Sequence, residues 1–226
     1  MQHMHASTLG VVCLLLFATS ARGQSLWMTE HLANNCEYEA ALASWSMAPA
    51  DVRGSFDSRL LKARILIQLD RGADAVSELS TLRKEASEKR MAEVLLALGL
   101  AQSSARMFRS AETTLRAARE KGADTDLVDA AIAEVWLSSG RKGEAEALLR
   151  QVLRRAPDMA GPMLNLAALR AAEGNVTEAA ALIRFAWALG YQNPTELRKA
   201  PEFERVRALG LINDLISTPS RRCRIY

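Results

Sequence analysis

The sequence has little of several residue types that mark particular protein classes. Only 6 of its 226 residues are proline, and none lies between Ala50 and Ala156. Because proline is the strongest helix breaker, this stretch is open to helix throughout. Aromatic residues make up 5% of the chain, and three histidines and three cysteines leave little room for a metal cluster. Serine-nucleophile motifs, glycine-rich phosphate loops and paired catalytic carboxylates are also missing, so no residue pattern points to an enzyme or a cofactor site.

The chain also lacks a strong excess of one charge. It has 29 basic and 26 acidic side chains, a net charge of +3, which speaks against a nucleic-acid binder driven by bulk charge. What it has instead is 39 alanines and 32 leucines, the residues with the best helix propensities. This apolar content excludes intrinsic disorder and predicts an all-α protein.

The first 23 residues resemble a secretory leader. An apolar stretch runs from Leu9 to Ala18, and small residues follow, so cleavage is expected after Gly23 or Ala21. The stretch is shorter than the ~20 residues that span a bilayer, and no later segment is long and apolar enough to do so. We therefore expect an exported, periplasmic or secreted protein without stable membrane insertion. The residues before Leu9 lack lysine and arginine, which leaves the true start codon open.

Two cysteines, Cys36 and Cys223, remain after removal of this leader. Export permits a disulfide. An intramolecular bond needs the two Cα atoms within ~7 Å, however, and in an elongated repeat array these residues fall near opposite ends. The sequence therefore argues against a bond between Cys36 and Cys223 and leaves open whether either of them pairs with anything.

An internal repeat decides the expected fold. Ala111, Ala145 and Ala179 recur at one constant interval of about 34 residues, and Gly140 and Gly174 are separated by the same interval. The same register carries large apolar positions and further small positions, namely Leu115, Leu149 and Ile183, then Ala118, Val152 and Ala186. Small side chains allow two helices to approach closely, while leucine or isoleucine fills the flanking volume. Glycine just past a helix end closes the helix.

The pattern is most complete in residues 126–159. Its recurring positions are Ile132, Ala133, Trp136, Gly140, Ala145, Leu149 and Pro157. In spacing and residue type it resembles the tetratricopeptide repeat, a helix–turn–helix unit of about 34 residues. The resemblance covers about residues 22–193 and implies a right-handed α-α superhelix, in which stacked units complete one another's core.

The repeat predicts the following organisation. Five units are expected, over about residues 24–55, 56–91, 92–125, 126–159 and 160–193, followed by a capping helix over 194–217 and a flexible tail over 218–226. The anchor alanines Ala75 and Ala111 lie two residues further apart than the repeat interval, so a two-residue insertion is expected around Lys84 to Met91. In the capping segment, apolar residues recur at helical spacing, namely Phe203, Val206, Leu209, Ile212 and Leu215.

The resemblance also implies a partner-binding groove, lined by the first helix of each unit. In this register the groove residues are Leu96, Leu100, Ala130, Glu134, Leu137, Leu164, Ala168 and Ala171. The carboxylate clamp of the family needs lysine, arginine and asparagine here, and only Asn165 lies near such a position. An apolar groove instead favours a docked amphipathic helix or extended apolar segment. Equally, these leucines could serve packing within the array alone.

The sequence thus predicts a non-catalytic scaffold or adaptor that binds another protein or peptide and uses no cofactor. A chaperone-like holder of unfolded exported clients, or an accessory subunit of an enzyme or secretion complex, is the alternative. The arginines of the C-terminal half are expected to form a solvated face, with a patch for an anion or an acidic partner as the alternative. Oligomeric state and partner identity are left open.

Overall fold

The computed structural model describes residues 26–191 and 193–217. Within these ranges the chain forms α-helices and one short 3-10 helix, without any β-strand, so the predicted all-α fold is confirmed. The predicted leader and the predicted flexible tail over 218–226 lie outside the described ranges.

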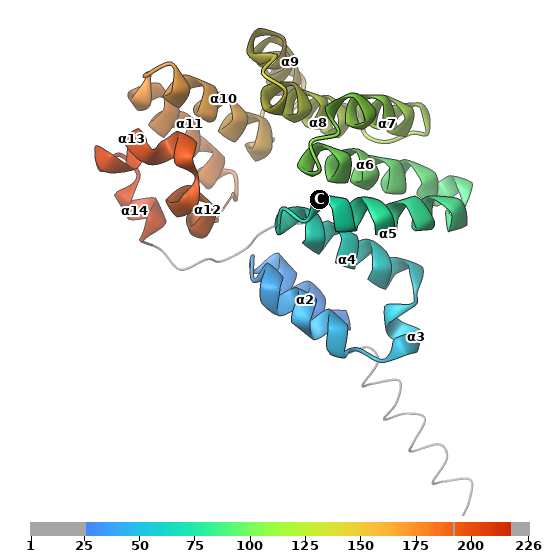
Figure 1. Cartoon of the computed structure of the whole chain (residues 1–226). Helices are drawn as coiled ribbons and strands as arrows, with labels where there is room; N and C mark the ends of the chain where they lie inside the picture. Colours follow the sequence, from blue (N-terminus) through green and yellow to red (C-terminus); the bar gives the residue numbers. More distant parts are fainter. Residues whose placement is uncertain (1–25, 192, 218–226) are drawn as a thin grey trace, which may run out of the picture.

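Five helix pairs follow one another along the chain. They are α1 (described over residues 26–34) with α2 (Tyr38–Met47), α4 (Phe56–Gln68) with α5 (Gly72–Glu85), α6 (Glu88–Ser104) with α7 (Phe108–Glu120), α8 (Thr125–Ser138) with α9 (Lys142–Arg155), and α10 (Ala160–Ala172) with α11 (Val176–Ala188). A single helical turn, α3 (Ala50–Arg53), connects the first two pairs. The pairs stack side by side into a curved array, the predicted solenoid (Figure 1).

In each pair, the turn between the two helices contains one residue in the left-handed backbone conformation. These residues are Cys36 (φ 62°), Asp70 (φ 55°), Arg106 (φ 60°), Gly140 (φ 87°) and Gly174 (φ 86°). In every case the next residue donates its backbone N–H to the carbonyl five positions earlier, at 2.8–2.9 Å, the bond that characterises a Schellman helix end. The expected role of Gly140 and Gly174 as helix stops is therefore confirmed, and three other residue types serve the same role in the first three units.

The spacing of these turn residues locates the irregularity in the repeat. They recur at the constant repeat interval except between Asp70 and Arg106, where the separation is two residues longer. The first helix of that unit, α6, has 17 residues, whereas α4, α8 and α10 have 13 or 14. The insertion is thus absorbed by a longer helix rather than by a loop.

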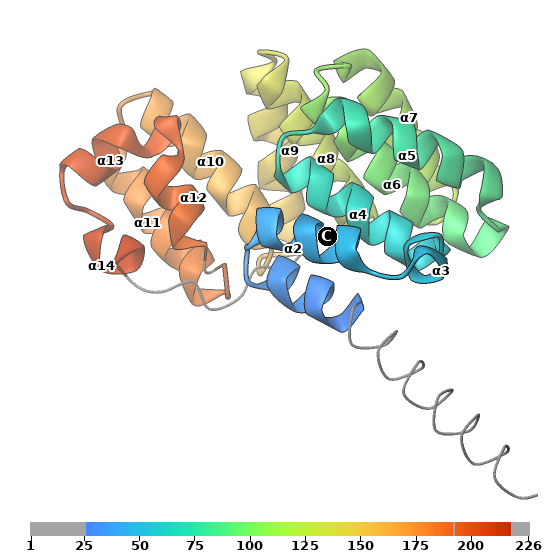
Figure 2. The same cartoon turned by 60° about the horizontal axis from the view of Figure 1, so that its bottom comes forward.

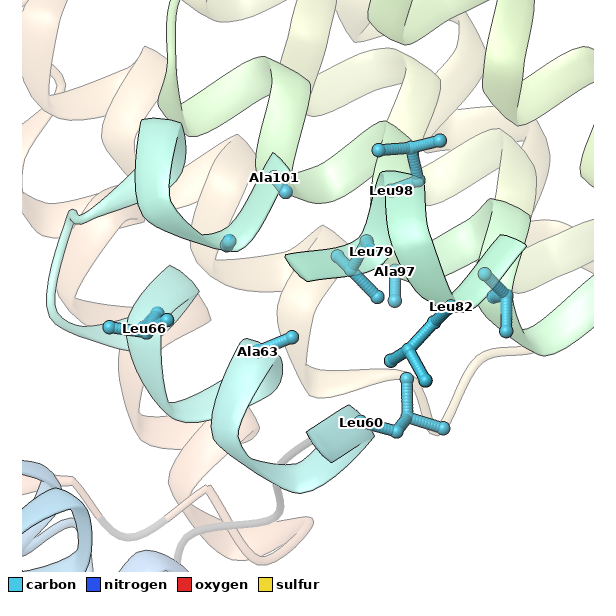
Figure 3. Close-up of a cluster of buried hydrophobic side chains, with 10 residues drawn as sticks. Leu60, Ala63, Leu66, Leu79, Leu82, Ala97, Leu98 and Ala101 are labelled. Carbon is cyan, nitrogen blue, oxygen red and sulfur yellow. The ribbon is translucent and has the colours of Figure 1, made fainter. Parts of the chain in front are cut away.

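The core consists of the small and large apolar positions of the repeat. All of the anchor positions are fully buried, namely Ala75, Ala111, Ala145, Ala179, Leu79, Leu115, Leu149 and Ile183, each at 0% exposure. Figure 3 shows one such cluster, where Leu79 of α5 lies among side chains of α4 and α6. Burying a leucine or isoleucine stabilises the fold by about 1.5–3 kcal/mol. Because these side chains are buried against neighbouring helices, each unit depends on the next for part of its stability.

The C-terminal segment departs from the prediction of one capping helix over 194–217. It forms four short elements instead: α12 (Pro194–Lys199), a 3-10 turn η1 (Pro201–Phe203), α13 (Glu204–Ala208) and α14 (Asn213–Ile216). Pro201 disfavours helix at the residue before it and so ends α12, and Gly210 (φ 70°) follows α13. Four of the five spaced apolar residues are buried as expected, whereas Leu209 is 61% exposed.

Curvature brings the two ends of the array toward each other. In two views related by a 60° turn, α12 lies on the side of the molecule that faces α2 (Figures 1 and 2). We call the surface on the inside of this curve the inner face.

Candidate partner-binding face

The predicted groove residues lie on α6, α8 and α10, the first helices of three successive units. Leu96, Leu100, Ala130, Leu137, Leu164 and Ala168 are half-buried, Glu134 is exposed, and Ala171 is buried at 6% exposure. Their role in binding a partner remains a prediction.

The half-buried leucines border the cores of consecutive units. Leu96 and Leu100 pack against the cluster formed by α6, α7 and α8, while Leu137 packs against the cluster of α8, α9 and α10. Leu164 packs against the cluster of the C-terminal elements. One side of each leucine therefore stabilises the array, and the other side stays accessible.

Glu134 is the single charged residue among these predicted positions. The residue as a whole is exposed, yet the protein around its carboxyl group desolvates the charge and raises its pKa. The negative charge of Glu196 on α12 raises the pKa of Glu134 further. The charge of the C-terminal cap therefore acts on a carboxyl group of α8.

Further residues gather around the same two carboxylates. Burial raises the pKa of Tyr38 on α2 to about 12, with a smaller effect from the charge of Glu196. Burial likewise raises the pKa of Tyr191, which senses the charges of Glu196, Tyr38 and Glu202. We call the residues that influence one another in this way the closing cluster: Tyr38 on α2, Glu134 on α8, and Tyr191, Glu196 and Glu202 in the C-terminal segment. Sequence periodicity could not find it, because it joins units far apart in the chain.

Glu196 is held in place by a local capping arrangement. Asn193 accepts a hydrogen bond from the Glu196 backbone N–H at 3.0 Å and donates its side-chain amide to Oε2 of Glu196, also at 3.0 Å. Burial raises the pKa of Glu196, and the charge of Glu202 adds to that effect. The pKa direction is thus the same for both carboxyls of the inner face.

A glutamate that recurs along the array forms hydrogen bonds between units, and the sequence analysis did not identify it. Glu112 and Glu146 each directly follow an anchor alanine, Ala111 and Ala145, and so recur at the repeat interval. Glu112 accepts a hydrogen bond from Trp136 Nε1 at 3.1 Å, and Glu146 accepts one from Arg170. Trp136 and Arg170 are separated by that interval too, so these bonds link equivalent positions of consecutive units. The repeated glutamate could have indicated these contacts, but the sequence analysis used only the repeated alanines to define the register.

Most arginines of the C-terminal half are exposed, as a solvated face requires, but several also make ion pairs or hydrogen bonds, and Arg207 is half-buried. Arg170 is 8% exposed. The contacts are as follows: Arg155 with Asp126 and Asp129; Arg170 with Glu146, Glu173 and Glu178; Arg184 with Asp214; Arg198 with the Ile216 carbonyl; and Arg207 with the carbonyls of Leu197 and Ala200. These ion pairs and hydrogen bonds connect neighbouring helices and stabilise the C-terminal cap.

Cys36 is disulfide-bonded. The sequence left open whether Cys36 pairs at all and argued only against a bond to Cys223, which stays a prediction. The other two cysteines of the chain, Cys13 and Cys223, both lie outside the described ranges.

Sites for other chemistry are not found in the part of the chain that the structure describes. No group of three or more His, Cys, Asp or Glu side chains there could hold a metal ion. His31 stacks on Trp27 with ring centroids 5.1 Å apart and lies 3.2 Å from the Asn35 amide. None of the described helices has the length and apolar character to cross a membrane.

Comparisons with known proteins agree on the fold. The chain is similar to TTC0263, described as a thermophilic TPR protein of Thermus thermophilus, with 20% identity over 85% of this chain and 99% of that chain and a TM-score of 0.64. It is also similar to PilF of Pseudomonas aeruginosa, with 18% identity over 88% of each chain and a TM-score of 0.51. No family model matches the sequence, and a search of curated proteins finds no match.

Proposed function

We propose that the protein is a non-catalytic interaction scaffold of the cell envelope, and that its inner face binds an amphipathic helix or extended apolar segment of another protein. The carrying observation is the row of half-exposed leucines on α6, α8 and α10. Apolar side chains in consecutive units offer a partner a continuous contact, and such a face suits either a helix or an extended segment.

Export is supported from two directions. The first 23 residues have the composition of a secretory leader. Cys36 is disulfide-bonded, and structural disulfides form and persist in oxidising compartments such as the periplasm. Fractionation with N-terminal sequencing tests this: a periplasmic or secreted chain beginning at Gln24 or Arg22 is expected, and a full-length cytoplasmic chain would contradict it.

Replacing apolar side chains of the inner face by a charged one tests the binding role. In Leu100→Asp and Leu137→Asp, a docking role predicts folded proteins that no longer cross-link to their partner in the envelope fraction. Leu209→Asp is the matched control, because Leu209 is 61% exposed on the C-terminal cap. Circular dichroism of each variant reports whether the helices persist.

The outcomes separate the open interpretations. Unfolding of both inner-face variants would assign the leucines to packing. One stoichiometric partner that is lost in these variants and kept in the control supports a scaffold. Capture of many unrelated unfolded exports would instead favour the chaperone-like holder.

A further inference from the structure

One position of the repeat stays accessible in four consecutive units. It lies six residues before the left-handed residue of each turn, as Arg64 does before Asp70. Each residue at this position is half-buried or exposed, while the residues directly before and after it in the chain are buried. The position therefore points out of the packed helices in the same way in every unit. We call its four residues the inner row: Arg64 on α4, Leu100 on α6, Glu134 on α8 and Ala168 on α10.

The four helices that carry the inner row are neighbours in space. Helix α4 contacts α6, α6 contacts α8, and α8 contacts α10. Packed helices lie about 8–10 Å apart, so consecutive residues of the inner row are separated by a similar distance. A segment that crosses these helices one after another meets the four residues at regular steps.

The positive charge in the inner row is already balanced by the chain itself. Arg64 Nη2 donates to Glu93 Oε1 at 2.7 Å, and Glu93 Oε2 also accepts from Arg90 Nε at 2.8 Å. Arg90 forms a further ion pair with Asp57 at 2.8 Å. Two guanidinium groups and two carboxylates therefore neutralise one another at this end of the row.

The negative charge in the inner row has a different environment. Glu134 is exposed, and the two influences that raise the pKa of its carboxyl group, desolvation and the negative charge of Glu196, both oppose ionisation. A cation placed beside this carboxylate would favour the ionised form instead. Leu100 and Ala168, the neighbours of Glu134 in the row, are uncharged. The complementary pattern is thus one positive charge between two apolar side chains.

This pattern specifies the segment that the inner face binds, and it rests on the proposed function. We propose that the partner is an amphipathic helix of another protein with a lysine or arginine in the middle of its apolar face, placed against Glu134. Helix residues at i and i+7 share a face and lie about 10.5 Å apart, close to the spacing of the inner row. Apolar side chains one heptad before and after the basic residue then lie over Leu100 and Ala168.

The spacing favours a helix over an extended segment. In an extended segment, side chains on one face recur about every 6.6 Å, which does not match the separation of packed helices. The difference in size between Leu100 and Ala168 also leaves more room for a large apolar side chain on the α10 side of the basic residue.

Three synthetic peptides test the proposal. They are amphipathic helices of equal length with the same leucine face and a neutral polar face, and they differ at the central position of the leucine face, which is lysine, glutamine or glutamate. Fluorescence anisotropy measures their Kd values. The lysine peptide is expected to bind the unmodified protein about tenfold more tightly than the glutamate peptide, near the lower end of the range for close charge pairs at interfaces.

Charge-altered proteins separate this contact from the overall charge of the chain. Glu134→Gln is expected to bind the lysine and glutamate peptides equally, and Glu134→Lys is expected to prefer the glutamate peptide. Glu120→Lys, at the exposed end of α7, changes the net charge by the same amount as Glu134→Lys and is expected to keep the preference of the unmodified protein. A reversed preference cannot result from partial unfolding, which would weaken the binding of all the peptides. Circular dichroism checks that each variant is folded.

The outcomes distinguish this proposal from the function on which it rests. Equal binding of the three peptides, or an unchanged preference in Glu134→Lys, would overturn the basic partner residue. If that equal binding were lost in a folded Leu100→Asp protein, the docking role of the leucines would still stand. If none of the peptides bound, the proposal and the docking role would both be contradicted.

Discussion

The middle of the array and its two ends are built in different ways. Helices α6 to α11 have 13 to 17 residues and repeat the same alanine and leucine positions. At the ends, α2 has 10 residues and the C-terminal elements have between 3 and 6. A terminal unit has a neighbour on one side only, so repeated apolar contacts alone secure it less well. The ends add polar contacts that do not recur along the array and, at Cys36, a disulfide.

The largest expected effect is in the middle. Leu149→Ala removes a side chain that is 0% exposed between α8, α9 and α10, and we expect a loss of about 3 kcal/mol from the free energy of unfolding. Leu215→Ala in the cap, where the residue is 8% exposed, is expected to lose less because short elements can relax into the cavity. Urea unfolding monitored by circular dichroism measures both. A larger loss in the cap would reverse the comparison.

The second largest loss of stability is expected where the backbones of α5 and α6 lie in close contact. A Cβ atom on Gly72 would lie 2.3 Å from the backbone nitrogen of Ala105, so α5 and the end of α6 would have to separate. We expect Gly72→Ala to cost about 1–3 kcal/mol. The control is Gly143→Ala in α9, where a Cβ would meet nothing within 4 Å and where alanine is expected to stabilise the helix by about 0.5–1 kcal/mol. Similar melting temperatures for the two variants would count against this contact.

A smaller effect is expected at the N-terminal end. Trp45 Nε1 donates to Ser58 Oγ at 2.9 Å and joins α2 to α4, and the Lys62 ammonium lies 4.6 Å from the Trp45 ring centroid. Trp45→Phe keeps an aromatic ring but leaves the buried Ser58 hydroxyl without this donor, at a cost of about 1 kcal/mol. Proteolysis confined to the first pair would accompany the loss, whereas unchanged stability and protection would mean that the bond is dispensable.

The sequence predicted the features that recur and missed those that do not. Alanine and leucine at the repeat interval determined the helix pairs and the buried positions, because each unit needs the same close crossing. Turns at Cys36, Asp70 and Arg106 carried no glycine signal, although they adopt the same left-handed conformation as Gly140 and Gly174. A backbone conformation is imposed there by the helices on either side, and the residue type does not reveal it.

The candidate site was predictable only in part. Periodicity placed Leu100, Glu134 and Leu137 on first helices of the units, but it says nothing about contacts between distant units. The effect of the Glu196 charge on the pKa of Glu134 and of Tyr38 depends on the accumulated curvature of the whole array. The same curvature weakens the argument that opposite ends of the chain must lie far apart, which was the reason to expect no bond between Cys36 and Cys223.

The carboxylates between helices and those of the inner face should respond differently to acid. Ion pairs and hydrogen bonds with Lys62 and Arg59 lower the pKa of Glu78 despite its partial burial, and contacts with Arg116 and Trp136 lower that of Glu112. Their stabilising contribution is present above the ordinary glutamate pKa of 4.5, and it is lost as the pH falls through the lowered values.

We therefore expect the melting temperature to fall below about pH 4.5 and this acid limb to become shallower in Glu78→Gln, which cannot ionise. Glu134→Gln is the matched control. The raised pKa of Glu134 means that its carboxyl binds a proton before the acid limb begins. If Glu134→Gln flattened the limb as much as Glu78→Gln did, acid sensitivity could not be assigned to the ion pairs between helices.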